Sequence, residues 1–112
     1  MQKEQIVLKC YDLLKEMIPV LSKFPRDQKF LVGDRIQNII SDVMETLIEA
    51  YYINAEEKKA KLLSVNVEIE KLRYYIRLCY DSGYFNSFKY KEIIEKINEI
   101  GRMAGGWIKS LK

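Results

Sequence analysis

The run "KLRYYIR", residues 71–77, is the part of the sequence whose residue types are best suited to bind a partner. Arg73 and Arg77 are four residues apart, so on a helix they share one face, with Lys71 close by and tyrosines between them. Guanidinium groups bind phosphates in a bidentate manner, and tyrosine rings can stack on nucleobases. Lys71, Arg73 and Arg77 are therefore candidate contacts to nucleic acid or to an acidic protein. The alternative, which the residues alone favour, is a solvated helix face on which Arg77 pairs with Asp81.

The sequence offers little for catalysis. It contains no histidine, which removes the commonest general base and the Glu-x-x-His motif of di-iron bundles. Four carboxylates fall near the polar side of one predicted helix, where a solvated acidic face is the expected role: Asp34, Asp42, Glu45 and Glu49. The sequence has neither a phosphate-binding loop nor a nucleophile elbow. We therefore predict a protein that is not an enzyme and that uses no cofactor or metal.

The two cysteines, Cys10 and Cys79, are too few for a disulfide framework, and their spacing matches no zinc motif. Both fall within apolar stripes. Reactive thiols need an exposed, electropositive setting, so buried structural cysteines are the better interpretation.

Length and composition predict one soluble domain over residues 1–112. Apolar residues make up 48% of the chain and charged residues 31%, which is enough for a core and a solvated surface. Only 5 glycines and 2 prolines are present, so a few long helices are favoured over many turns. The net charge of +3 is mild. The first nine residues lack a long apolar segment, and the longest uncharged run has only the seven residues "SGYFNSF", so we expect a cytoplasmic protein.

Apolar residues at helical spacing run through almost the whole chain in four stripes. The first stripe is Ile6, Cys10, Leu13, Met17 and Leu21; the second is Phe30, Gly33, Gln37, Ile40, Met44, Leu47 and Tyr51. Second rows widen the stripes, for example Ile36, Ile39 and Val43. The third is Leu62, Val65, Ile69, Leu72, Ile76 and Cys79; the fourth is Ile93, Ile97, Ile100, Ala104, Trp107 and Leu111. The breaks between them are short, so consecutive helices should be antiparallel neighbours. The fold class predicted is all-α, an antiparallel up-down four-helix bundle.

Residues at the breaks have the chemistry that helix ends need. Pro25 can open the second helix, Asn54 can end the second helix or cap the third, and Asn86 or Ser87 can cap the fourth. Gly83 is a suitable stop for the third helix. Pro19 should kink the first helix near its end.

Two amides fall at or beside the apolar stripes. Gln37 lies in the second stripe and Asn66 flanks the third. Buried amides must be hydrogen-bonded, and such polar groups can fix the register of packed helices.

Gly101 and Gly105 lie within "GRMAGGWIK", where the helical period continues in spite of three glycines. Each helical glycine destabilises by roughly 1 kcal/mol relative to alanine, so we expect these two to allow a close approach by another helix or subunit. Trp107 is then a candidate anchor of an oligomer interface.

Charge differs between segments of the chain. Residues 27–53 hold five acidic and two basic residues, whereas residues 83–112 hold three acidic and six basic ones. Opposite charges could pair copies of the chain head to tail, in contacts that close into a ring if the angle permits.

Three segments resemble one known family in the same order and spacing: "KFPRDQKFLVGDRIQNIISDVMETLIEAYY", "EIEKLRYYIRL" and "EIGRMAGGWIKS". They resemble the Avd (accessory variability determinant) proteins of diversity-generating retroelements. They also resemble, more loosely, the four-helix bundles encoded in 23S ribosomal RNA intervening sequences.

The resemblance implies a four-helix bundle that assembles as a homopentamer and has no catalytic activity. It implies binding to a retroelement reverse transcriptase and to RNA or DNA, in support of mutagenic copying of a template RNA into cDNA. The binding arginines that it implies on the third helix correspond to Arg73 and Arg77. Gly33 then allows close packing early in the second helix, and Asp34 and Arg35 become candidates for an intersubunit ion pair.

Two alternatives remain at this point. One is the ribosomal intervening-sequence branch of the same fold, whose role is undefined. The other is an oligomeric scaffold that binds no nucleic acid. A neighbouring reverse-transcriptase gene and template repeat would favour the retroelement role, whereas a position inside a 23S gene would favour the ribosomal branch.

Overall fold

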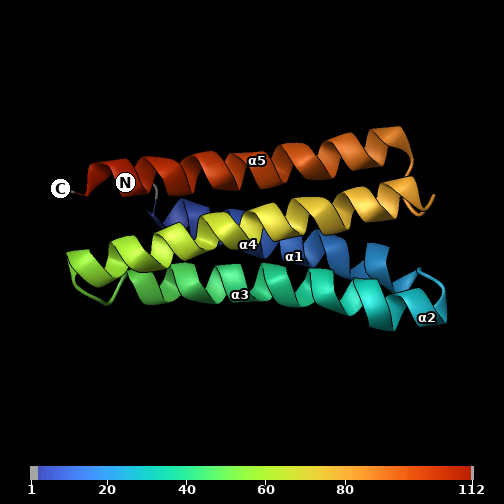
Figure 1. Ribbon diagram of the computed structural model, residues 1–112, viewed down its shortest axis with the longest axis horizontal. Helices are drawn as coiled ribbons and strands as arrows, with labels where there is room; N and C mark the ends of the chain where they lie inside the picture. The colour runs from blue at the N-terminus through green and yellow to red at the C-terminus, as the bar shows by residue number, and fades with distance from the viewer. Residues whose placement is uncertain (1–2, 112) are drawn as a thin grey trace.

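The computed structural model describes residues 3–111, and the side chains of residues 5–111. The described residues form four helical rods and no strand, which confirms the prediction of an all-α chain with four helices. The first rod is α1 (Lys3–Ser22), and the second joins α2 (Arg26–Gln28), the π-helical turn η1 (Lys29–Gly33) and α3 (Asp34–Ala50). The third rod is α4 (Ala55–Asp81) and the fourth is α5 (Ser87–Ser110). Figure 1 shows the chain turning back between successive rods.

The helix ends follow the predicted chemistry. Asn54 caps α4 by accepting a hydrogen bond from the backbone N–H of Glu57 at 2.9 Å, and Asn86 caps α5 by accepting from the N–H of Lys89 at 2.7 Å. Gly83 follows α4 with a φ of +85°, a conformation that glycine adopts without strain. α1 continues through Pro19 to Ser22. The second rod begins at Arg26, directly after Pro25.

The π-helical turn η1 changes which face of the second rod is buried. Within it the backbone N–H of Asp34 donates to the carbonyl of Lys29, five residues back, where an α-helix would bond four back. The turn therefore resets the helical phase between Phe30 and α3. The predicted second stripe was wrong in part: Phe30 is exposed, and Gln37, Met44 and Tyr51 only border the core. The buried row of α3 is Ile36, Ile39, Ile40, Val43, Leu47 and Ala50.

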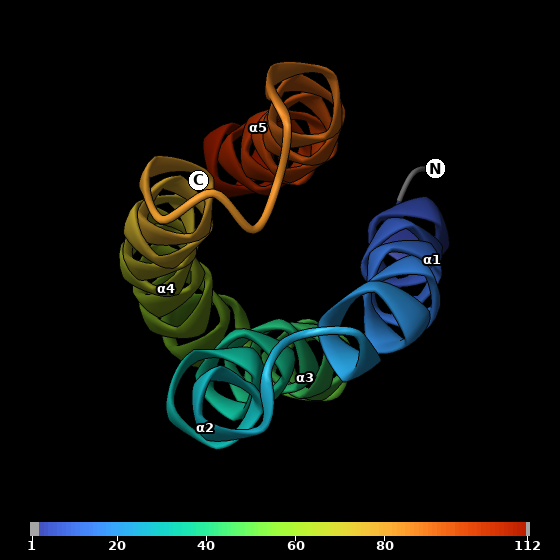
Figure 2. The same cartoon turned by 90° about the vertical axis from the view of Figure 1, so that its right-hand side faces the viewer.

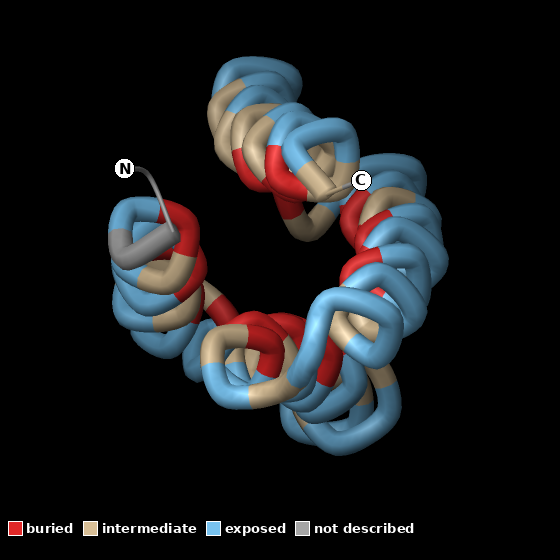
Figure 3. Tube along the Cα trace, turned by 90° about the vertical axis from the view of Figure 1, so that its left-hand side faces the viewer, coloured by how far each residue is buried: buried red, intermediate tan, exposed pale blue. Residues whose placement is uncertain are grey.

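The core is one continuous cluster that runs the length of the bundle. Figure 3 shows buried residues on the inward sides of the rods and exposed residues outside. The first and third stripes are buried as predicted, and the fourth is buried from Ile93 to Trp107. No polar side chain of the described residues is in the buried class. Gln37 is half-buried and Asn66 is exposed, so the expectation of buried amides is wrong for both.

Trp107 differs from its predicted role. The sequence suggested an interface anchor, but the side chain is 1% exposed within one chain, and its ring lies 5.6 Å from the ring of Tyr51. Trp107 occurs at the same helical phase as Ile100 and Ala104, both buried, so it packs into the bundle.

Figure 2 views the bundle from the end at which α2 begins, and it shows α1 and α4 at opposite corners, with α3 and α5 between them. Charged side chains bridge α1 and α5. Glu16 accepts a hydrogen bond from Lys96 and forms an ion pair with Lys89. The Nζ of Lys9 lies 3.4 Å from a carboxylate oxygen of Glu99.

Candidate nucleic-acid and partner interface

Two adjoining grooves lie between α4 and α5 and share Arg73 and Asn98. One, of about 360 Å³, is lined by Asn66, Ile69, Arg73, Asn98, Gly101 and Arg102. The other, of about 270 Å³, is lined by Glu70, Arg73, Tyr74, Arg77, Tyr90, Ile94 and Asn98. Arg73, Tyr74 and Arg77 of the basic run therefore lie along one wall of these adjoining grooves, which are together called the α4–α5 groove, and α5 supplies the other wall. Lys71, which the sequence grouped with these arginines, lines neither groove.

Arg73 is held in a fixed orientation at the centre of this groove. Its Nε donates to Oδ1 of Asn98 at 2.9 Å, and its Nη1 donates to Oε1 of Glu70 at 2.8 Å. Nη2 makes no hydrogen bond to the described residues and lies next to Gly101, where a Cβ would come within 3.3 Å of it. A guanidinium positioned in this way can offer its remaining donors to an anion with little loss of side-chain entropy.

Lys71 and Arg77 are more exposed and are paired within their own helix. The Nζ of Lys71 lies 2.9 Å from a carboxylate oxygen of Glu68, and the Nε of Arg77 lies 3.6 Å from a carboxylate oxygen of Asp81. The predicted Arg77–Asp81 pair is thus confirmed. Because exposed pairs of this kind contribute about 0–1 kcal/mol, a polyanion can compete for either cation.

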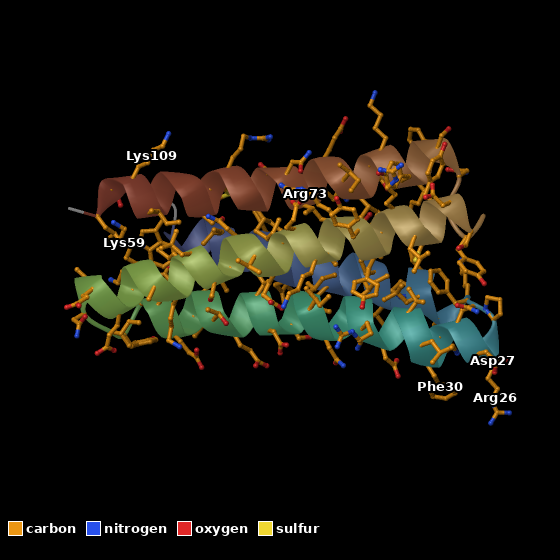
Figure 4. The ribbon with its side chains drawn as sticks, in the orientation of Figure 1. Arg26, Asp27, Phe30, Lys59, Arg73 and Lys109 are labelled. Carbon is orange, nitrogen blue, oxygen red and sulfur yellow. The ribbon has the colours of Figure 1, made fainter. Side chains whose placement is uncertain are left out.

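Further basic side chains lie on the α4–α5 face, Arg102 within the groove and the others beyond it. These residues are exposed, and none has a carboxylate within 4 Å among the described side chains: Lys59, Lys91, Arg102 and Lys109. Figure 4 shows Lys59 and Lys109 at the end of the bundle where α4 begins and α5 ends, with Arg73 further along the same two helices. At 1.5 Å per residue, the distance along α4 from Lys59 to Arg77 is about 27 Å. The α4–α5 face therefore carries separate cations over most of its length.

The remaining predicted interface residues lie apart from this groove, except for Gly101. Asp34 and Arg35 are exposed at the start of α3, and the guanidinium carbon of Arg35 lies 5.5 Å from the ring centroid of Tyr75 on α4. Gly101 allows the close approach of Arg73 from the same chain. A Cβ added at Gly105 would have no other atom within 4 Å, so Gly105 is an open point on the α5 surface.

Sequence reasoning missed Asn98 and Arg102, which complete the groove. Its only signal for α5 was the excess of basic residues over residues 83–112. The spacing within α5 is a second signal that could have identified Asn98 and Arg102, because Lys91, Asn98 and Arg102 lie seven and four residues apart on one helix face. Their meeting with Arg73 depends on how α4 and α5 pack, which no local pattern contains.

Both cysteine thiols are buried and protonated. Burial raises the pKa of Cys10 to about 12 and that of Cys79 to about 11, so neither thiol is ionised at neutral pH. The prediction of buried structural cysteines is confirmed.

Hydrogen bonds and ion pairs around Glu16 and Lys89 shift the pKa of both groups. The hydrogen bond from Lys96 lowers the pKa of the Glu16 carboxyl, and burial opposes this effect in part. The pKa of Lys89 is raised, first by its hydrogen bond to Glu92. These charges hold two helices together, and they lie on a different side of the bundle from the α4–α5 groove.

A larger concavity lies at the end of the bundle, away from the basic groove. Its volume is about 470 Å³, and its lining includes Phe24, Tyr84, Phe85 and Phe88. Of its two lysines, Lys89 is already paired with Glu16 and Glu92. Size alone therefore does not make this cleft the candidate site, because it offers little free charge.

Within residues 3–111 there is no helix with both the length and the apolar character needed to cross a bilayer. The described side chains also include no group of three or more potential metal ligands.

A comparison with protein families found a match over residues 4–111 to the family described as bAvd-like. No curated protein matches the sequence. No solved structure matches it either.

Proposed function

The chain belongs to the bAvd-like family, a family of retroelement accessory proteins, and from this premise we propose that it binds a retroelement reverse transcriptase together with nucleic acid. In this role it supports mutagenic reverse transcription, in which template RNA is copied into altered cDNA. It works in the cytoplasm and performs no chemistry of its own. The reaction belongs to the transcriptase, and the bundle supplies binding and position.

The α4–α5 groove is the observation that supports this function most directly. Arg73 is oriented by Asn98 and Glu70, and its Nη2 lies beside Gly101 with donors to spare. Arg102 lies in the same groove, and further exposed cations follow the two helices beyond it. Oriented guanidinium groups with amide neighbours can bind phosphate oxygens, and a row of cations can follow a nucleic-acid backbone.

Arg77 contributes within this groove, and Lys71 contributes on the α4 surface outside it, after each exchanges its intrahelical carboxylate partner for phosphate. The exchange is favourable because release of the counterions condensed on nucleic acid drives association. Each phosphate that the protein neutralises therefore makes the affinity more dependent on salt.

The functional protein is proposed to be a homopentamer of antiparallel up-down bundles. Asp34, Arg35 and Gly105 remain candidates for contacts between copies, since all three lie on the surface of one chain or open onto it. Gly101 is better explained by its contact with Arg73, and Trp107 by its burial.

Arg73→Glu combined with Arg77→Glu tests the binding role. Affinity for single-stranded RNA and for the transcriptase should fall, while the helical circular dichroism signal and the oligomer mass stay unchanged. With RNA, the slope of log K against log [salt] should become shallower by about one unit for each phosphate that is no longer neutralised. Arg26→Glu is a matched control, because Arg26 is exposed at the far end of the bundle from Lys59 and Lys109 (Figure 4).

Each contrary outcome has its own interpretation. Unchanged RNA and transcriptase binding would refute the groove as the site and favour a scaffold that binds no nucleic acid. A fall in oligomer mass together with binding would mean that the arginines serve assembly. Equal loss with the Arg26 control would show only a general charge effect.

A further inference from the structure

The two parts of the α4–α5 groove differ in the chemistry of their linings. The part that contains Arg102 (the arginine compartment) has two guanidinium groups, and none of the described residues that line it carries a carboxylate or an aromatic ring. The part that contains Tyr74 and Tyr90 (the tyrosine compartment) has two aromatic rings among its walls. Arg73 and Asn98 line both compartments and therefore lie at the boundary between them.

The rings of the tyrosine compartment are available for stacking. Tyr74 is 65% exposed although it lines the groove, and it makes no hydrogen bond or ring contact with the described residues. Tyr90, on α5, is stacked on Tyr80, with ring centroids 4.5 Å apart and planes inclined by 12°. Tyr80 does not line the compartment, so Tyr90 is the member of this stack that borders the groove. Nucleobases stack on aromatic rings of this kind, and every base has a π face for such a contact.

The polar groups of the tyrosine compartment suit the edge of a base better than a phosphate. The carboxylate of Glu70, although bonded to Arg73, is 58% exposed, and it can accept hydrogen bonds from the amino groups of bases. The same negative charge disfavours a phosphate at this point. The amide of Asn98 keeps its donors for a base, since Arg73 uses only Oδ1 and Nδ2 makes no hydrogen bond to the described residues.

We infer that the α4–α5 groove binds a single strand of nucleic acid, with a phosphate in the arginine compartment and a neighbouring base stacked on Tyr74 in the tyrosine compartment. This inference rests on the nucleic-acid binding in the proposed function and names the kind of strand that is bound. In a duplex both faces of a base are covered by its neighbours and its edge is paired, so only a single strand can place a base in the tyrosine compartment. Because the contact is to the face of the base, it does not select a sequence.

Single exposed apolar residues are common on protein surfaces and need no partner. Tyr74 differs from such a residue because it shares a groove with a second tyrosine ring and with the guanidinium group of Arg73, which two hydrogen bonds hold in place. Binding to phosphates alone requires cations and makes no use of the rings. The contribution of Tyr74 to binding therefore distinguishes base stacking from a purely electrostatic contact.

Labelled strands of equal length provide the test, with affinity measured by fluorescence anisotropy. The ligands are oligouridine RNA, oligothymidine DNA, an abasic strand that keeps the phosphates but has no bases, and an RNA duplex. The wild-type chain should bind each base-containing single strand at least about fivefold more tightly than the abasic strand, which corresponds to the stacking of one base. RNA and DNA single strands should behave alike, because both present the face of a base.

Tyr74→Ala should weaken binding of the base-containing single strands by at least about fivefold and leave the affinities for the abasic strand and the duplex unchanged. Tyr74→Phe keeps the ring and should bind like the wild-type chain. Because no phosphate contact is lost, the slope of log K against log [salt] should stay the same in Tyr74→Ala, whereas Arg77→Glu should make it shallower. Tyr11→Ala is the matched control, since Tyr11 is 50% exposed on α1, at the opposite corner of the bundle from α4 (Figure 2). Helical circular dichroism confirms that each variant is folded.

The outcomes separate this inference from the proposed function. A wild-type chain that binds none of the four ligands would refute nucleic-acid binding and the stacking with it. Equal affinity for base-containing and abasic strands would refute the stacking alone and leave a groove that binds phosphate. Equal loss of all four ligands in Tyr74→Ala, or a shallower salt slope, would show that Tyr74 supports the cations and does not contact a base. A loss confined to RNA or to DNA would assign the contact to the sugar and overturn base stacking.

Discussion

The Nε of Arg73 donates a 2.9 Å hydrogen bond to Oδ1 of Asn98, and this bond joins α4 to α5 across 25 residues of sequence. Arg73 thus holds α4 and α5 together and is also a candidate ligand-binding residue. Arg77, one turn further along α4, has no such link to a neighbouring helix among the described residues and pairs with Asp81 of its own helix. The two arginines should therefore differ in their effects on stability.

Arg73→Ala should lower the free energy of unfolding by about 1 kcal/mol, because two hydrogen bonds are removed and Asn98 is left without its partner. Arg77→Ala should change it by only a few tenths of a kcal/mol, since an exposed pair four residues apart contributes roughly that much. Urea titration followed by circular dichroism measures both. Equal changes in the unfolding free energy of the two variants would contradict the role of Arg73 in holding α4 and α5 together.

Gly101→Ala and Gly105→Ala form a matched pair on α5. Alanine favours a helix over glycine by about 1 kcal/mol, and the Cβ at position 105 meets nothing within 4 Å, so Gly105→Ala should stabilise the chain by up to that amount. At position 101 the new Cβ would lie 3.3 Å from Nη2 of Arg73, so the guanidinium must shift. Gly101→Ala should gain less stability and should weaken RNA binding, whereas Gly105→Ala should leave it intact. If Gly105→Ala instead lowers the oligomer mass, Gly105 belongs to an interface.

Glu16→Gln should lower the free energy of unfolding by about 1 kcal/mol at neutral pH, because it removes a carboxylate that two lysines of α5 contact. The pKa of Glu16 is lowered in the folded chain from its ordinary value of 4.5, so the unfolded chain binds the proton more readily. The stabilising contribution is therefore complete above pH 4.5 and disappears as the pH falls through the lower, folded-state pKa. Urea titrations at a series of pH values should show wild type and variant converging in acid. Glu99→Gln, which affects a more exposed pair, is the control and should have a smaller effect.

Cys10 and Cys79 should react with a thiol reagent only when the chain unfolds, because both thiols are buried and their pKa values are raised. Replacing either with alanine should reduce stability by about 1 kcal/mol through poorer packing and leave RNA binding unchanged. Absorbance of the released reagent, with and without denaturant, measures the reaction. Rapid labelling of the native chain would contradict the buried positions.

Trp107 is the single tryptophan, so its fluorescence reports directly on its environment. A side chain that is buried within one chain should keep its blue-shifted emission when the oligomer is diluted to lower mass. An emission that shifts to the red as the mass falls would restore the interface role that the sequence suggested.

Local sequence pattern was sufficient to predict the four helices, their caps and three of the four buried stripes. The residues from Ile6 to Leu21 and from Leu62 to Cys79 repeat at helical spacing without interruption, and a helix with such a stripe must bury it. Asn54 and Asn86 cap helices through contacts only three residues away, which sequence spacing expresses directly.

Tertiary structure decided the features that depend on contacts between distant segments or on helical phase. The π turn η1 inserts a bond to the fifth residue back, so the phase that Phe30 suggests does not carry into α3, and Phe30 is exposed. Gly101 was expected to admit a neighbour, but only the packing of α5 on α4 identifies that neighbour as Arg73. The groove exists for the same reason: helix periodicity tells which side chains share a face, whereas helix packing determines which two faces meet.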